Sequence, residues 1–355
     1  MKNQNNITVL TLGNKYDFDS FRKLHKSRRL FKKKGFNYAT STYDNLLKNK
    51  LPEIKTKKVI IFPFFPFSHW NRHIEHRNYQ GIYGASSFYE KFLRFFKKVD
   101  HVVKRNLKGK DLSFINSPIL SSELRDKVLV KRKLRTAKVP TPQLFKISKI
   151  DALYRYTKSG NEFMIKPRYG SMGKGITFLN NDRCQTNFSF RNKKILSRKS
   201  DYGWNFRTIK DRHGFLKELL KNDVYIEEAV KSRLIDGKKF DLRVYVFSGE
   251  VIYIYARTNE ADSVTTNISQ GGKGMNQAFL KKLPPDLIRK IKQTAIKTAK
   301  VLGTNFAGVD IIVDKNFKNI YVLDVNFFPG FPKKKTFDLT ARLVKLLKAH
   351  LKVKV

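Results

Sequence analysis

Two carboxylates and an amide lie close together in the C-terminal part of the chain. Residues 306–314 and 321–326 form two apolar runs with alternating polarity, joined by a short polar segment, so we expect a β-hairpin there. Asp310 lies on the first strand, and Asp324 and Asn326 lie two residues apart on one face of the second. Carboxylate and amide oxygens are the ligands that Mg²⁺ prefers. The pattern indicates a magnesium site for nucleotide phosphates, although a solvated strand face beside a polar turn would have the same pattern.

A glycine-rich segment at residues 170–175 lies between two extended apolar runs. Glycines let the backbone approach phosphate oxygens and point amide N–H groups at them. The segment is neither a Walker loop nor a dinucleotide-binding fingerprint, because Gly175 follows Lys174 and a strand follows instead of a helix. Upstream, Lys166 lies in an apolar strand, where its ammonium needs either an anion such as phosphate or a path to water.

Polar residues at the ends of further strands are also candidates for binding a nucleotide. Glu227 and Glu228 end a short apolar strand, whose backbone could pair with adenine while a carboxylate accepts from ribose hydroxyls. Arg243 and Arg257 lie near carboxylates on the next two strands. They could form structural ion pairs, or each could donate two hydrogen bonds to a phosphoryl group that is being transferred. Asn267 precedes a Gly-Gly pair and offers an amide side chain beside a flexible backbone.

The charge of the chain is its most unusual bulk property. Lys and Arg number 74 against 29 Asp and Glu, which gives a net charge of +45 spread along most of the length. Such a field attracts polyanions, so nucleic acid, a phosphorylated small molecule or an acidic polypeptide would suit it. A lysine-rich proteome would give the same number.

Other features restrict the class of protein. No apolar run approaches the ~20 residues of a membrane helix. A single cysteine, Cys184, excludes an internal disulfide framework. No secretory signal is visible near the N-terminus, so we expect a cytoplasmic protein without a membrane partner.

The strand and helix patterns divide the chain into three parts. Residues 1–116 alternate strands and helices, which is typical of a small parallel α/β domain. Residues 117–222 contain the lysine strand and the glycine-rich hairpin, and residues 223–355 are β-rich with helices near 285–302 and 336–352. The fold class is therefore α/β, with α+β character in the C-terminal part.

The order of these motifs resembles the ATP-grasp superfamily, and within it the RimK-type and glutathione-synthetase-like carboxylate–amine ligases. The resemblance covers roughly residues 117–347 and is most specific at residues 125–127 (Arg-Asp-Lys) and 265–272 (Thr-Thr-Asn-Ile-Ser-Gln-Gly-Gly). It implies two α+β lobes that grip ATP, preceded by a small parallel α/β domain. It also implies an ATP-dependent ligase that forms an amide through an acyl phosphate, with Mg²⁺ or Mn²⁺ as the metal.

The resemblance assigns roles to individual positions. ATP would be bound by Lys127, Lys166, Gly170, Ser171, Met172, Gly173, Lys174, Gly175, Glu227 and Glu228. The reacting centre would contain Arg243, Arg257 and Asn267, and the metal would be held by Asp310, Asp324 and Asn326.

Asp324 departs from this pattern, because RimK-type ligases usually have Glu at that position. Asp-x-Asn followed by Phe-Pro-Gly resembles instead the ATP-grasp inositol polyphosphate kinases, whose anionic substrates would suit the charge of the chain. A kinase of a polyanionic small molecule is therefore the alternative, while the Asn267 segment favours a ligase. A nucleic-acid-binding protein with a decayed ATP site is not favoured, because Lys127, Lys166 and all three metal-ligand candidates are present. The acceptor would be an anionic small molecule, peptide or protein, and an oligomer is compatible with the sequence.

Overall fold

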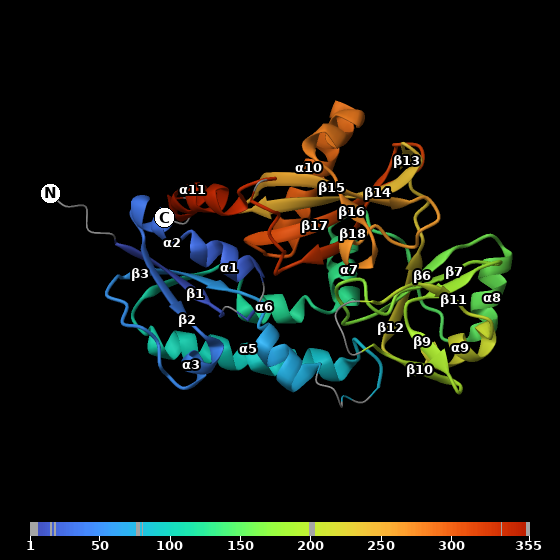
Figure 1. Ribbon diagram of the computed structural model, residues 1–355, viewed down its shortest axis with the longest axis horizontal. Coiled ribbons are helices and arrows are strands. Elements are labelled where there is room, and N and C mark those ends of the chain that lie inside the picture. Colours follow the sequence, from blue (N-terminus) through green and yellow to red (C-terminus); the bar gives the residue numbers. More distant parts are fainter. Residues whose placement is uncertain are drawn as a thin grey trace.

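The computed structural model describes residues 6–14, 16–17, 19–75, 79, 81–198, 203–334 and 336–352, with side chains up to 347. Figure 1 shows three parts, with the N-terminal domain at the left, a central lobe at the right and a C-terminal lobe across the top. This arrangement agrees with the expected fold of two lobes preceded by an α/β domain.

The N-terminal domain is a parallel sheet with helices packed around it. Its strands, in the order β2-β1-β3-β4, are β1 (Ile7–Leu12), β2 (Asn37–Ser41), β3 (Lys58–Pro63) and β4 (Asp111–Phe114). Its helices are α1 (Asp19–Lys26), α2 (Arg28–Lys33), α3 (Tyr43–Leu47), α4 (Phe67–His69), the π-helix η1 (Trp70–Ile74) and α5 (Ser86–Asn106). All of these strand pairs are parallel, as predicted for a small parallel α/β domain. In α5, Phe88, Phe92, Phe95 and Phe96 are buried.

The central lobe is built on an antiparallel sheet in the order β11-β8-β7-β6-β12-β5. Its strands are β5 (Leu144–Phe145), β6 (Phe163–Pro167), β7 (Thr177–Leu179), β8 (Cys184–Thr186), β11 (Arg207–Thr208) and β12 (Val224–Glu228). Two helices, α8 (Ile150–Lys158) and α9 (Arg212–Leu219), and the hairpin of β9 (Ser189–Arg191) and β10 (Lys194–Leu196) complete it. The glycine-rich segment joins the antiparallel strands β6 and β7, as predicted.

The strand pairing bears on the expected division of the chain at residues 117–222 and 223–355. Because β12 pairs with both β5 and β6, it belongs to the central sheet rather than to the C-terminal lobe. We therefore propose that the division between the lobes follows Glu228.

The C-terminal lobe contains a second sheet with the strand order β16-β15-β14-β17-β18, and β13 pairs with β14. Its strands are β13 (Leu234–Ile235), β14 (Lys238–Phe247), β15 (Glu250–Glu260), β16 (Lys273–Gly274), β17 (Phe306–Val313) and β18 (Ile320–Asn326). Its helices are the 3₁₀ turns η2 (Ile268–Gln270) and η3 (Gln277–Lys282) and the helix α10 (Pro285–Val301). The hairpin predicted from residues 306–326 is formed by β17 and β18.

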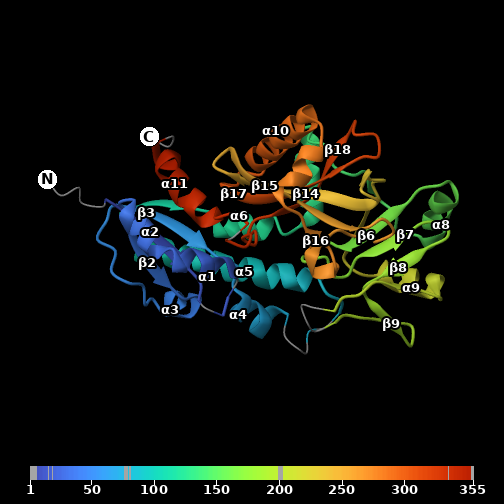
Figure 2. The ribbon, with the colours of Figure 1, turned by 45° about the horizontal axis from the view of Figure 1, so that its top comes forward.

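Helices from outside the lobe join it to the rest of the chain. After α6 (Pro118–Glu123), α7 (Lys127–Thr136) adds Val130 and Leu134 to the core of the C-terminal lobe. The last described helix, α11 (Leu339–Lys352), contacts both β15 and α2, so this helix lies beside the N-terminal domain in Figures 1 and 2. None of the described helices is long and apolar enough to cross a bilayer.

A buried asparagine fixes the start of β17 against the end of the N-terminal domain. The side-chain Nδ2 of Asn116 donates to the backbone carbonyls of Phe306 and Phe327, at 2.6 and 3.0 Å, and its Oδ1 accepts from the backbone N–H of Phe306. The strands that carry the candidate site residues are therefore anchored at the ends next to the N-terminal domain.

Candidate active site

The first group of site residues is a buried carboxylate between two lysines. Oε1 of Glu227 on β12 lies 2.5 Å from Nζ of Lys166 on the neighbouring strand β6, and its Oε2 lies 2.9 Å from Nζ of Lys131 on α7. The side chain of Glu227 is only 1% exposed. Burial by itself raises the pKa of Glu227, but Lys131 and Lys166 together outweigh burial and bring the pKa below its ordinary value. Glu227 is therefore a fixed anion that can accept a hydrogen bond.

Lys131 was not singled out from the sequence. It lies one helical turn after Lys127, so the two ammonium groups leave the same face of α7. Its Nζ also donates to the carbonyl of Val322 on β18 at 3.1 Å, and the residue is 2% exposed. The four-residue spacing from Lys127 was the available signal, but it does not stand out among so many lysines.

The second group comprises the predicted metal ligands. In the register of β17 and β18, Asp310 is paired with Asp324 and Gly308 with Asn326, so the three ligand candidates lie on adjacent strand positions. Nζ of Lys127 lies 2.5 Å from Oδ1 of Asp324. The helix start that carries Lys127 is fixed by Asp126, which accepts from two backbone N–H groups as the N-cap of α7.

Two arginines bind the carboxylates beside the metal-ligand candidates. Arg243 on β14 is the cross-strand partner of Asp310, and its Nε and Nη2 donate to the two carboxylate oxygens at 2.7 and 2.8 Å. Arg257 on β15 forms the equivalent fork with its own cross-strand partner Asp241, and its Nη2 also lies 3.1 Å from Asp310. The strand register therefore places each arginine opposite the aspartate to which it donates two hydrogen bonds.

The electrostatics of Asp310 follow from these contacts. Burial raises the pKa of Asp310, but the guanidinium groups of Arg243 and Arg257 outweigh burial and bring it to about 2. The carboxylate is ionised at neutral pH, as a metal ligand must be. Both arginines use Nε and Nη2 for the carboxylates, and neither Nη1 hydrogen-bonds to any residue that the structure describes.

The oxygens of Asp310, Asp324 and Asn326 suit Mg²⁺, but the three side chains are not equally available as ligands. Asp324 has one cationic partner, Lys127, and is partly exposed, so it is the most available ligand. Oδ2 of Asp310 already contacts the guanidinium groups of both Arg243 and Arg257. Its Oδ1 accepts a hydrogen bond from Arg243 alone and therefore keeps a free lone pair. The amide nitrogen of Asn326 lies 3.4 Å from Asp310, and a half-turn of that amide would present its oxygen instead. Within the described part of the chain no cluster of three or more His, Cys, Asp or Glu exists, so the set is two carboxylates and an amide.

The glycine-rich loop lies against the Asn267 segment of the C-terminal lobe. Asn267 is the N-cap of η2, and its Nδ2 is 3.0 Å from where a Cβ on Gly173 would stand. The hydroxyl of Ser269 donates to the carbonyl of Met172 at 2.7 Å. Gly173 has a φ of +68°, which favours glycine, and a Cβ there would press on the side chains of Asn267 and Gln270, which would have to shift. The structure thus brings the predicted loop and the predicted Asn267 into contact.

Two predicted site residues lie elsewhere. Glu228 is exposed, because it leaves the opposite face of β12 from Glu227. Lys174 is buried, and its ammonium lies 2.8 Å from Glu75 of the N-terminal domain. Neither side chain joins the cluster formed by Lys127, Lys166 and their carboxylate partners.

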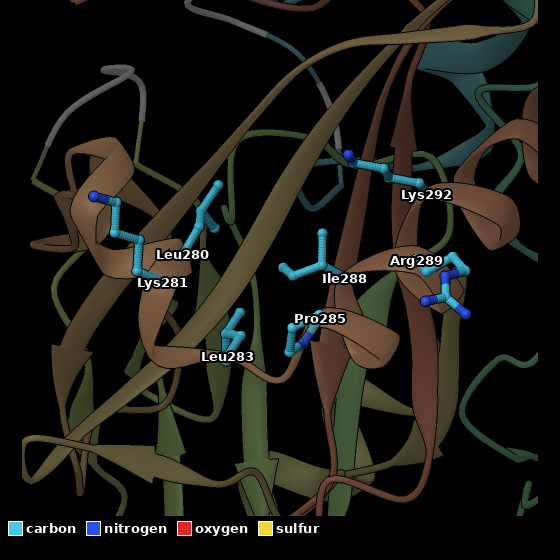
Figure 3. A pocket seen from close by; sticks show the side chains of 7 residues that line it. All are labelled: Leu280, Lys281, Leu283, Pro285, Ile288, Arg289 and Lys292. Atoms are coloured by element: carbon cyan, nitrogen blue, oxygen red, sulfur yellow. The ribbon is translucent and has the colours of Figure 1, made fainter.

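A separate groove of about 620 Å³ lies on the outer side of the C-terminal lobe, at η3 and α10. Figure 3 shows its lining: Leu280, Lys281, Leu283, Pro285, Ile288, Arg289 and Lys292. None of the predicted site residues lines this groove, so it is not part of the candidate active site.

Comparison with known proteins identifies relatives of the chain. A sequence model of the YheC/D-like ATP-grasp family matches residues 114–352. The tetrahydromethanopterin:α-L-glutamate ligase of Methanosarcina acetivorans is 27% identical over 212 residues, which are 59% of this chain and 56% of that protein. The glutamate–LysW ligase ArgX of Sulfolobus acidocaldarius is 25% identical over 237 residues, which are 66% of this chain and 72% of that protein. The match thus spans little more than half of the first relative.

The fold also matches a solved structure along nearly its whole length. The ATP-grasp ligase PsnB, complexed with a minimal precursor, Mg and ADP, superposes with a TM-score of 0.58. The alignment covers 97% of this chain and 98% of that chain at 14% identity, which shows a shared fold.

Proposed function

Because the chain belongs to the YheC/D-like ATP-grasp family, we propose that it is an ATP-dependent carboxylate–amine ligase. One observation carries the proposal: the carboxylates of Asp324 and Asp310 lie on paired strand positions, with Lys127 on one side and Arg243 and Arg257 on the other. Such a set can bind phosphate, metal and an anionic reacting group side by side. Two ligases among its relatives and the PsnB complex with Mg and ADP support this reading.

The nucleotide would lie across the two groups described above. The base would lie near Glu227, whose fixed negative charge suits the amino group of adenine and disfavours the carbonyl of guanine. Lys166 and Lys127 would contact the phosphates, and the backbone N–H groups of residues 170–175 would cover them. Mg²⁺ held by Asp310, Asp324 and Asn326 would supply charge neutralisation at the phosphates, and Mn²⁺ suits the same oxygen ligands.

The reaction would proceed in two steps at the arginines. A carboxylate oxygen of the first substrate attacks the γ-phosphorus, ADP leaves, and an acyl phosphate forms. An amine nitrogen then attacks the acyl carbon, the bond from that carbon to the phosphate oxygen breaks, and orthophosphate leaves with the bond electrons while the nitrogen loses a proton to it or to water. The Nη1 groups of Arg243 and Arg257 would stabilise the charge that develops on the transferring group, and Asn267 would orient the acceptor. Positioning and charge neutralisation dominate phosphoryl transfer, so the protein needs no specialised general base.

The charge of the chain supports an acidic or otherwise anionic acceptor. At +45 the protein attracts anions over a long range, which raises the rate at which an acidic amino acid, peptide or protein reaches the site. The names of the two relatives include glutamate, and PsnB was solved with a precursor. Phosphorylation of a polyanionic small molecule finds no support among these relatives.

Product analysis with a substrate panel tests the proposal. The enzyme, ATP and Mg²⁺ are combined with acidic amino acids, peptides with free C-termini, simple amines and inositol phosphates. We expect ADP and orthophosphate in equal amounts, together with a product whose mass equals the two substrates minus one water. A phosphorylated acceptor and ADP without orthophosphate would mean that the enzyme is a kinase.

A further inference from the structure

The glycine-rich loop is fixed to the N-terminal domain by a buried ion pair. Nζ of Lys174 in the loop lies 2.8 Å from Oε1 of Glu75, and the two side chains are 1% and 6% exposed. Glu75 follows the π-helix η1, and its Oε2 accepts a hydrogen bond of 2.7 Å from the indole nitrogen of Trp70. One oxygen of the carboxylate therefore binds the loop, and the other binds the N-terminal domain.

Further contacts surround this ion pair. The ammonium of Lys174 lies 4.7 Å from the ring centre of Tyr83 and 5.8 Å from that of Trp204. The hydroxyl of Tyr83 is 3.0 Å from Oγ of Ser171, near the start of the loop. Gly84 packs so closely that a Cβ there would be 2.6 Å from Pro167. The N-terminal domain thus contacts the loop at its base, its start and its lysine.

Arg125 continues the network toward the metal-ligand strands. Its guanidinium carbon lies 4.2 Å from the ring centre of Trp70, and its Nη2 donates to Oγ of Ser171 at 3.4 Å. Arg125 is two residues before Lys127, which binds Asp324. Trp70 therefore contacts both Glu75, the partner of Lys174, and Arg125, which lies just before α7.

Breaking the ion pair would leave a charge in a dry environment. Separating a buried pair is strongly unfavourable, because each charge has lost its water and the opposite charge that compensates for this loss is removed. The loop cannot lift from the site without separating Lys174 from Glu75 or exposing both. The pair therefore favours the closed position of the loop, in which Met172 contacts Ser269 of the opposite lobe.

A closed loop matters for the reaction proposed above, on which this inference rests. Water that reaches the acyl phosphate attacks it, restores the carboxylate and releases orthophosphate, so that ATP is consumed without an amide. Exclusion of water by a closed loop prevents that loss.

We propose that Glu75 and Lys174 are positioning residues that hold the glycine-rich loop closed during amide formation. The N-terminal domain thereby contributes to the coupling of ATP consumption to amide formation without touching ATP. Lys174 then acts through Glu75, and not as the phosphate ligand that its place in the loop suggests.

The test compares K174M and E75Q with K174R and with a matched control, K282M. Lys282 forms an exposed ion pair with Asp236, so K282M removes a lysine–carboxylate pair that is not buried and that does not involve the loop. We expect K174M and E75Q to consume at least ~3-fold more ATP per amide than wild type, since an open loop admits water. K174R and K282M should keep the wild-type ratio, and the double variant E75Q/K174M should be no worse than either single variant. Equal ratios in all variants would overturn the proposal.

Hydrogen–deuterium exchange of residues 170–175 gives a second readout that needs no acceptor substrate. In the absence of nucleotide, K174M and E75Q should exchange faster than wild type in this segment, while K282M should match wild type. Slow exchange in both variants together with lost ATP-analogue binding would make Lys174 a phosphate ligand and refute the positioning role. If wild type forms no amide with any substrate, the proposed function fails, while the exchange experiment still decides whether the pair holds the loop.

Discussion

Asp310 and Asp324 occupy facing positions on β17 and β18, yet the structure predicts different consequences for their removal. The Lys127–Asp324 pair is partly open to water, with side chains 14% and 34% exposed. Pairs of this kind contribute only ~0–1 kcal/mol to stability. The Asp324→Asn variant also keeps an oxygen for the hydrogen bond from the backbone N–H of Val325. We therefore expect a loss of at most ~1 kcal/mol in the free energy of unfolding.

Asp310→Asn should be far more damaging to the fold. The side chain is 8% exposed and receives Arg243 through two nitrogens and Arg257 through a third. Neutralising this carboxylate leaves two buried guanidinium groups with reduced compensation, and breaking a buried pair in this way costs ~3–5 kcal/mol. Both variants should nevertheless lose turnover by at least ~100-fold, because each removes a proposed metal ligand at a site where charge neutralisation would carry the rate.

Two assays on the same preparations separate these effects. Denaturant unfolding gives the free energy for each protein, and ADP release at saturating ATP and Mg²⁺ gives turnover. The expected result is a stable, inactive Asp324→Asn variant and an unstable, inactive Asp310→Asn variant. Wild-type turnover in Asp324→Asn would refute the metal assignment, and a larger stability loss for Asp324→Asn than for Asp310→Asn would refute the electrostatic reasoning.

Three further predictions concern neighbouring groups. Lys131→Met leaves Glu227 with Lys166 as its one lysine partner, so the KM for ATP should rise about tenfold with a smaller change in kcat. An unchanged KM would show that Lys131 does not contribute to nucleotide binding. Asn267→Ala should lower kcat by about 100-fold while ATP-analogue affinity changes little, because the amide would face the acceptor; equal losses in kcat and affinity would contradict that placement. Because the pKa of Asp310 is lowered from 3.8 to about 2, its contribution to stability is complete above pH ~4 and declines as the pH falls toward 2. The difference in unfolding free energy between wild type and Asp310→Asn should therefore be constant from pH 7 to ~4 and shrink below it, whereas a difference that stays constant down to pH ~2 would show that the pKa is not lowered.

Local patterns predicted the parts of the site that lie on single elements. Alternation of apolar residues placed Asp310, Asp324 and Asn326 on a hairpin, and β17 and β18 form that hairpin. The position of the glycine-rich segment between extended runs predicted a loop between antiparallel strands, which β6 and β7 confirm. Both signals depend only on the period of the chain and on turn chemistry, which act over a few residues.

Such local patterns could not predict contacts between segments that are far apart in the sequence. Lys131 meets Glu227 across 96 positions of the chain, and Lys174 meets Glu75 across 99. A lysine in an apolar segment shows that a partner is needed, but not which carboxylate will supply it. The pairing of β12 with β6 likewise depends on tertiary packing, so the lobe boundary could not be placed from strand patterns alone.

The most direct test of the central claim follows an oxygen atom. The carboxylate substrate found in the product panel is prepared with ¹⁸O in its carboxyl group and turned over with ATP, Mg²⁺ and the amine. The account predicts that one ¹⁸O per amide appears in orthophosphate, because the carboxylate oxygen that attacks the γ-phosphorus leaves with it. Orthophosphate free of ¹⁸O, with amide still formed, would contradict the acyl-phosphate route and with it the role given to this site.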